Sequence, residues 1–504
     1  MKYFSRPGVT IPNRFRPCNR ASPRVLWMQG ILGAVLFLVG MICTSQATGN
    51  SDAKGEYRFE DVRLMRGPCC SDWGNDLVVD SEGNLLIAGR RGSLDLNHDG
   101  VIDIDTFGQP DPLITKLFHA DGMGSGWTKE VGGRGDDSAR GVASDGKGGL
   151  YAAGFFSDVM QIGGGVLESA GGKDGFVARF DLDGNMLWAR AIGGSAYDEM
   201  FRVASDSRGN AYVIGTATGK VDIDRDGKTD VTGTSKGSAL ITAWSPDGDL
   251  LWSLVSGGDA RVLGLGITTG PENEVYIAGA YQAGAPDFDA DGQADGPVAI
   301  TDTKPGPDGA IQYDLNGYYA RLSTQGKVDW IRTVSGPSIQ TAGGLAVGDN
   351  GALYVLGGHS VASDVDGNGV ADIDFVSLGE RKSQHDVDQN LYLLHVTREG
   401  DFLWSRTYTA SGIHLSIRGS RLLVSGTYLN DLDFDNDGEL ERHSDGDDRK
   451  EGYVAILNLE GELEQLLTIV GEAADVVNAA GLSPDGNTLY MTGYTQLGPI
   501  STAT

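Results

Sequence analysis

Two short β-hairpin patterns alternate along almost the whole chain. The first reads "ARGVASDGKGGLYAAGF" from Ala139 and "MFRVASDSRGNAYVIGT" from Met200, and it occurs seven times between Asn75 and Tyr494. Each copy has two alternating apolar runs separated by Gly, Asn or Asp, which is typical of a β-hairpin. Such self-similarity restricts the chain to the repeat architectures.

The second pattern is also a hairpin, and it often carries a tryptophan in its second strand. It reads "DGFVARFDLDGNMLWARAIGG" from Asp174 and "GYYARLSTQGKVDWIRTVSG" from Gly317, and it occurs six times. One hairpin of each kind makes a four-stranded unit. Seven first hairpins and six second hairpins predict an all-β chain, a seven-bladed β-propeller of four-stranded antiparallel blades.

The ends of the repeat array predict how the propeller closes. The last blade lacks its second hairpin, and "EYRFEDVRLMRG" (Glu56–Gly67) precedes the first repeat and reads as a strand. We expect this N-terminal strand to fill the outer position of the last blade. No segment beyond residue 50 has a helical period, so residues 48–504 are expected to form a single domain.

The N-terminal segment has the features of an export signal. Residues 1–47 carry six basic residues and no acids, the run 25–43 is uncharged, and Ser45-Gln46-Ala47 has the form of a signal-peptidase site. Residues 25–43 are also long enough to be retained as a membrane anchor. Both alternatives place the rest of the chain outside the cytoplasm, as a secreted, periplasmic or cell-surface protein.

Charge narrows the range of partners. The net charge is −29, and setting aside the six basic residues of the leader leaves −35 on the rest. This charge repels nucleic acid and anionic lipid, so neither is an expected partner. The remaining chain is suited to binding cations.

The pair of patterns "GGSAYDEMFRVASDSRGNAYVIGTA" and "DGFVARFDLDGNMLWARAIGG" resembles the bacterial beta-propeller repeat family, often called SBBP repeats. The resemblance covers nearly the whole chain after the leader. It implies a secreted or surface propeller and says little about activity, because that family is mostly uncharacterised.

Five acidic loops lie between the two hairpins of their blades and share the motif D-x-[DN]-x-[DN]-G-x-x-[DE]. This spacing matches the first nine positions of an EF-hand loop: side-chain oxygens at positions one, three, five and nine, a backbone carbonyl at seven, and glycine at six for the turn. The predicted Ca²⁺ ligands are Asp95, Asn97, Asp99, Val101 and Asp103; Asp222, Asp224, Asp226, Lys228 and Asp230; Asp287, Asp289, Asp291, Gln293 and Asp295; Asp364, Asp366, Asn368, Val370 and Asp372; and Asp433, Asp435, Asp437, Glu439 and Glu441.

The loops depart from an EF-hand at position twelve. Thr106, Gly233, Val298, Phe375 and Ser444 stand where an EF-hand has a bidentate Glu. We therefore expect affinities typical of extracellular modules, on the order of 10⁻⁴ to 10⁻³ M. The competing interpretation, acidic turns that only keep the surface soluble, does not explain five copies with glycine at one position.

Nothing in the sequence assigns catalytic residues. "GTSKG" (Gly233–Gly237) fits a nucleophile-elbow pattern without its strand-turn-helix context, and no histidines have metal-binding spacing. The recurrent Trp188, Trp252, Trp330 and Trp404 are expected to pack between blades. Cys69 and Cys70 are adjacent, so either a vicinal disulfide or two thiols fit them.

These observations favour a monomeric, calcium-binding scaffold that binds a protein or glycan partner at the cell surface. The alternative is a secreted propeller enzyme, a hydrolase or lyase acting on polysaccharide at the central channel. A channel lined with His, Arg, Tyr and carboxylates would favour the enzyme, and one lined with Val, Ala and Gly would favour the scaffold.

Overall fold

The computed structural model describes fourteen ranges of the chain, and every element in them is a β-strand. The ranges are 40–44, 58–63, 73–91, 111–118, 126–296, 315–336, 339–360, 362–365, 370–373, 390–429, 431–442, 450–470, 475–495 and 501–503. All belong to one compact unit, Leu36–Thr504. The prediction of an all-β chain is confirmed for these residues, and none of them forms a helix long and apolar enough to cross a membrane.

Four sheets in the C-terminal two thirds of the chain repeat one antiparallel order, in which each strand pairs with the next along the chain. The third sheet contains β11 (Glu199–Ser205), β12 (Ala211–Ala217), β15 (Ser238–Trp244) and β16 (Leu250–Val255). The fourth contains β18 (Arg261–Thr269), β19 (Val275–Gln282), β21 (Asn316–Leu322) and β22 (Val328–Val334). The fifth contains β23 (Gln340–Val347), β24 (Leu353–His359), β25 (Asn390–Val396) and β26 (Phe402–Tyr408). The sixth contains β27 (Ser411–Arg418), β28 (Arg421–Tyr428), β29 (Glu451–Asn458) and β30 (Leu463–Val470), with β33 (Ser501–Ala503) at its edge.

The first two sets of four strands are joined into one larger sheet. They are β3 (Trp73–Val79), β4 (Leu85–Arg91), β5 (Asp111–Leu117) and β6 (Gly126–Gly133), then β7 (Ser138–Ser144), β8 (Leu150–Ile162), β9 (Gly165–Phe180) and β10 (Met186–Gly194). The end of β6 pairs with the end of β8, which joins the two sets. In the second set no acidic motif occurs, and a long hairpin of β8 and β9, turning at Gly163 and Gly164, takes its place.

The last sheet combines strands from both ends of the chain in the order β2, β1, β32 and β31. The C-terminal hairpin is β31 (Asp475–Leu482) and β32 (Thr488–Thr495), and β2 (Arg58–Arg63) lies at the outer edge. The sequence places a strand at Glu56–Gly67 in this outer position. It does not indicate β1 (Gly40–Thr44), which pairs with β32 and lies within the segment assigned to the leader.

The turns of the first hairpins follow from Asp-x-x-Gly sequences. Asp80, Asp145 and Asp206 each accept backbone amide hydrogen bonds from the residues two and four positions later. A glycine with positive φ follows within the same turn, as at Gly83 (86°) and Gly209 (87°), where other residues would be strained.

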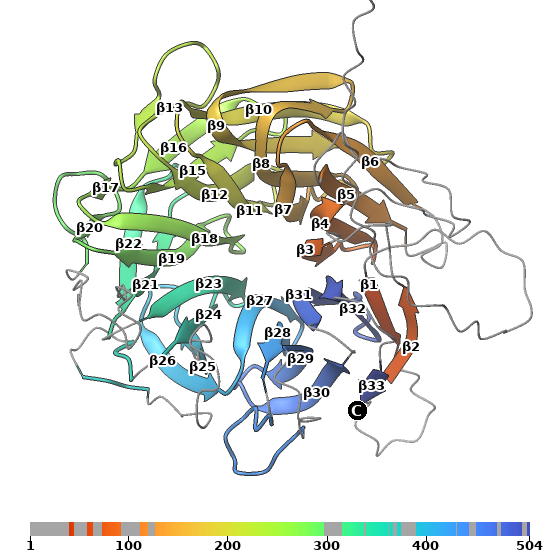
Figure 1. Ribbon diagram of the computed structural model, residues 1–504. Helices are drawn as coiled ribbons and strands as arrows, with labels where there is room; N and C mark the ends of the chain where they lie inside the picture. The colour runs from red at the N-terminus through yellow and green to blue at the C-terminus, as the bar shows by residue number, and fades with distance from the viewer. Residues whose placement is uncertain are drawn as a thin grey trace, which may run out of the picture. The chain divides into compact units, whose positions relative to one another are not determined.

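The first strands of the sheets lie side by side in chain order. β3 contacts β7, and the contacts continue through β11, β18, β23, β27 and β31. β31 in turn contacts β3. Figure 1 shows these strands grouped in the middle, with the other strands of each sheet outside them.

Each of these first strands has a β-bulge where it pairs with its second strand. The register shifts by one residue at the same point of every hairpin. The residues left out of the pairing are Asn75, Arg140, Phe201, Leu265, Gly343, Ile413 and Asn478. A bulge changes the direction of nearby side chains and increases the local twist of the strand. The seven bulges therefore lie at the same height along the first strands.

The tryptophans pack between neighbouring sheets, as the sequence predicts. The indole Nε1 of Trp188 donates to Pro246 O (2.9 Å), that of Trp252 to Thr324 O (3.0 Å) and that of Trp330 to Arg398 O (3.1 Å). Each acceptor lies in the outer hairpin turn of the next sheet. The hydrogen bonds add to the burial of the ring.

Candidate metal centre

The acidic loops connect the second and third strands of their sheets. The described ones join β12 to β15, β19 to β21, β24 to β25 and β28 to β29. Asp95, Asn97, Asp99, Val101 and Asp103 of the first loop lie outside the described residues, as do Asp366 and Asn368.

The carboxylate at position one bends the loop backbone around itself. Its Oδ2 accepts the amide hydrogen of the position-six glycine: Gly227 to Asp222 (2.9 Å), Gly292 to Asp287 (3.0 Å) and Gly438 to Asp433 (3.1 Å). These glycines have φ of 86°, 90° and 92°, which accounts for the glycine in the motif.

The carboxylate at position nine ties the end of the loop to its start. It accepts the backbone amide hydrogen of position two at Ile223 (2.6 Å), Phe288 (2.6 Å), Val365 (2.9 Å) and Phe434 (2.6 Å). The side chains of these position-two residues are buried in the core. The sequence predicts position nine as a cation ligand, and it does not reveal that one of its oxygens is held by the backbone.

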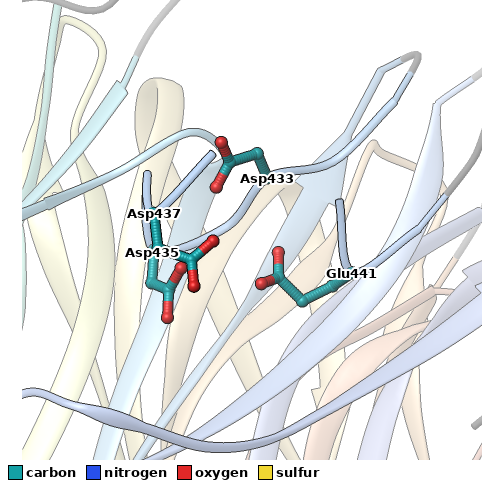
Figure 2. A group of neighbouring side chains, drawn as sticks. All are labelled: Asp433, Asp435, Asp437 and Glu441. Atoms are coloured by element: carbon teal, nitrogen blue, oxygen red, sulfur yellow. The ribbon is translucent and has the colours of Figure 1, made fainter. Parts of the chain in front are cut away.

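Three loops bring their carboxylates together. The ligand atoms of Asp433, Asp435, Asp437 and Glu441 all lie within 4.8 Å of one another (Figure 2). The same holds for Asp222, Asp224 and Asp230, and for Asp287, Asp289 and Asp291. Calcium binds oxygens at about 2.3–2.6 Å, so ligands on opposite sides of the ion are separated by about twice that distance. The spacing therefore fits Ca²⁺.

One predicted ligand, Asp226, already forms an ion pair with a nearby lysine. Lys228 Nζ lies 2.5 Å from Asp226 Oδ2, and this ion pair lowers the pKa of Asp226. The cluster of that loop forms without Asp226. Lysine at position seven thus weakens the ligand set of this loop relative to the loop at Asp433.

The loop at Asp433 holds carboxylates in an unfavourable environment. Burial raises the pKa of Asp435, and the charges of Asp437 and Asp433 raise it further. Burial and the charges of Asp435 and Asp433 likewise raise the pKa of Glu441. A cation between these groups would relieve both effects.

In two of the described acidic loops, one buried carboxylate oxygen has no hydrogen-bond partner. These are Oδ1 of Asp222 and Oδ1 of Asp433, the position-one residues of two loops. A buried oxygen without a partner is destabilising unless a cation or water satisfies it. The residues present therefore fit a bound cation.

Each described loop also pairs with the outer strand, or the residues following it, of the preceding sheet. Asp222 pairs with Gly193, Asp287 with Gly257 and Asp364 with Ser335, and Thr409 donates its amide hydrogen to Phe434 O (3.1 Å). A cation held by position one would thus lie at the seam between two sheets.

A cavity of about 380 Å³ lies between the first strands. Its lining is mostly Val, Ala, Gly, Leu, Ile, Ser and Thr, with Asp76, Arg202, His414 and Arg418 as its ionisable members. His414 Nε2 lies 3.7 Å from Asp76 Oδ1, and burial lowers the pKa of His414 to about 4. The sequence gives no sign of this pairing.

Comparison with known proteins finds solved structures of low similarity, of which two follow. No family model and no curated protein matches the chain. A protein of unknown function from Bacteroides caccae is 11% identical with a TM-score of 0.32, over 73% of this chain and 94% of that one. BamB from Moraxella catarrhalis is 13% identical with a TM-score of 0.34, over 86% of this chain and 100% of that one.

Proposed function

We propose that this chain is an exported seven-bladed β-propeller of the bacterial beta-propeller repeat type. Its acidic loops bind Ca²⁺, and one of its faces binds a protein or glycan partner. The blade count is supported by the repeated four-stranded order and by the contacts that run from β3 through every first strand to β31 and back to β3. Export is supported by the basic, then apolar, leader in residues 1–47.

The observation that carries the calcium proposal is the unpartnered oxygen of a position-one residue that belongs to a carboxylate cluster. It occurs at Asp433 in a group of four acids and at Asp222 in a group of three. An acidic turn that served only solubility would leave all its carboxylate oxygens in water, whereas here one oxygen of the position-one residue is buried and the other acids of the cluster are exposed. The pairing of each loop with the preceding sheet implies that Ca²⁺ stabilises the packing of neighbouring blades.

Calcium binding is tested by thermal unfolding of the exported protein. We expect millimolar Ca²⁺ to raise Tm by several degrees relative to excess chelator, whereas NaCl at equal ionic strength does not. Replacing Asp435 and Asp437 together by Asn should reduce the Ca²⁺ stoichiometry by one site in equilibrium dialysis. The exposed Asp183→Asn is the matched control and should leave it unchanged. No Tm shift together with no bound Ca²⁺ would refute the proposal.

A propeller enzyme is the second candidate, and the Asp76–His414 pair is the observation in its favour. Both oxygens of Asp76 already accept backbone amide hydrogens, from Leu77 and from Val142 of the neighbouring first strand β7 (both 3.0 Å). This engagement favours a structural role for Asp76. An enzyme would lose its polysaccharide hydrolase or lyase activity in His414→Gln while remaining folded.

A further inference from the structure

The bulge residues surround one mouth of the central channel. A cavity of about 340 Å³ at this level is lined by Asn75, Arg140, Phe201, Leu265, Gly343 and Asn478, together with Arg202. The bulge residues of six first strands therefore line it. Where an acidic loop follows the first hairpin, as after β12 and β19, the second strand ends and the loop begins at the same level, because the strands are antiparallel.

Two guanidinium groups in this mouth have no carboxylate within ion-pair distance. Among the described residues, Asp136 pairs with Arg90 (2.5 Å) and Lys173 (2.9 Å), whereas Arg140 and Arg202 take part in no ion pair. Arg202 Nη1 donates only to backbone oxygens, those of Arg140 (2.8 Å) and Phe201 (3.1 Å). Arg140 Nε is buried without a hydrogen-bond partner.

Arg140 is partly buried and lies near charges of both signs. Burial lowers the pKa of Arg140, and the charges of Arg202 and Arg90 lower it further, while Glu199 and Asp136 raise it. The ring of Phe155 holds the Arg140 guanidinium at 5.2 Å from its centroid. Positive charge that is buried and unpaired is stabilised by an anionic ligand, and arginine matches planar oxyanions in geometry.

The mouth has a polar side and an apolar side. The polar side is formed by Asn478, Asn75 and Arg140, which lie on consecutive first strands. The apolar side is formed by Phe201, Leu265 and Gly343 on the next three first strands. A Cβ on Gly343 would meet only Leu265 Cβ at 3.8 Å, so this position is open toward the cavity. The ligand that fits has an anionic group beside an apolar or ring face.

We propose that this channel mouth binds a small organic carboxylate, with Arg140 and Arg202 holding the carboxylate and Phe201 and Leu265 contacting its apolar face. The inference rests on the proposed binding role of this face and does not depend on calcium. It assigns a ligand class to the two arginines that the sequence leaves without a role.

The test is isothermal titration of the full chain at low ionic strength. The probes are benzoate and glucuronate, with inorganic phosphate as the comparison. We expect both carboxylates to bind at a single site and phosphate to bind more weakly. Arg140→Gln and Arg202→Gln should each weaken carboxylate binding by about tenfold or more. Lys147→Gln and Arg208→Gln, exposed and at the opposite ends of the same hairpins, remove the same charge and should leave it unchanged.

A second variant blocks the site without removing charge. Gly343→Trp should abolish carboxylate binding while Tm changes little, because the added ring enters the open mouth. Absence of carboxylate binding, phosphate binding as tight as carboxylate, or equal weakening by the control variants would each overturn the proposal. Repeating the titration on protein freed of Ca²⁺ by a chelator that is then removed by dialysis separates the two proposals, since a failure of calcium binding would leave carboxylate affinity intact.

Discussion

At the scale of single residues, Asp137 shows how the connection between the first and second sets of four strands is held. Its Oδ1 accepts the amide hydrogen of Ser157 (2.9 Å), while its Oδ2 is buried without a partner. Burial, together with the charges of Asp111 and Asp136, raises the pKa of Asp137 from 3.8 to about 7. The folded protein therefore binds more protons than the unfolded chain between these pH values, and this group makes folding less favourable as pH rises.

We predict that Asp137→Asn removes part of this pH dependence. Asn keeps the oxygen that accepts from Ser157 and carries no charge. Between pH 4 and pH 7 the free energy of unfolding should decrease less in the variant than in the parent protein. The difference between the two decreases should be about 1 kcal/mol or more at fixed Ca²⁺ concentration. Urea unfolding at several pH values measures this. Identical slopes for the variant, the parent and the exposed control Asp183→Asn would contradict it.

At the scale of elements, each tryptophan of an outer strand lies on a glycine of the next sheet. A Cβ at Gly248 would lie 2.8 Å from the ring of Trp188, and one at Gly326 would lie 2.5 Å from that of Trp252. The pattern repeats at Gly400 against Trp330. These glycines also have positive φ, so the turn and the packing between sheets both require them.

We predict that Gly248→Ala destabilises the protein by about 2–4 kcal/mol, from the left-handed backbone and the collision with Trp188 together. The control is Gly146→Ala, which has positive φ (70°) and open space around its Cβ. This variant should lose only about 1 kcal/mol of unfolding free energy, because it has the strain of the left-handed backbone without a collision. Chemical unfolding of both variants measures the difference, and equal losses would show that the tryptophan contact is not tight.

The elements themselves could be predicted from the sequence because alternation, Gly turns and the acidic motif are local signals. The bulges could not, because one extra residue at Arg140 or Phe201 leaves the apolar alternation of "RGVAS" and "FRVAS" almost unchanged. The contacts between each acidic loop and the preceding sheet could not be predicted either, for a different reason. These contacts form because neighbouring sheets pack in chain order, and no short sequence pattern encodes that order. Examples are the pairing of Gly193 with Asp222 and the hydrogen bond from Thr409 to Phe434. The apolar run that ends at Cys43 gave no sign of β1, because a leader and a strand are both apolar.

At the scale of the whole molecule, the contacts between first strands return to their start through β31. The last sheet is therefore the element that connects β27 to β3. It is also the sheet that draws strands from both ends of the chain. Stability of such an arrangement depends on neighbour contacts that each sheet shares with two others.

We predict that deleting residues 475–495 lowers Tm by on the order of 10 °C or abolishes cooperative unfolding, because β27 and β3 lose their shared neighbour. Removing residues 496–504 takes away β33, which pairs only with the edge of β30. This truncation should change Tm by a few degrees at most. Calorimetry compares the two, and similar Tm values would indicate sheets that fold independently.

The seven aligned bulges allow the ligand specificity of such a protein to evolve while its sheets stay the same. Five repeats contribute the side chain of their bulge residue to the channel mouth from a position outside the strand pairing, so that side chain can be exchanged without repacking its sheet. Recognition can then diversify one repeat at a time, in a combinatorial manner, on a constant framework. A library randomised at these positions alone would be a direct way to evolve new ligand specificities.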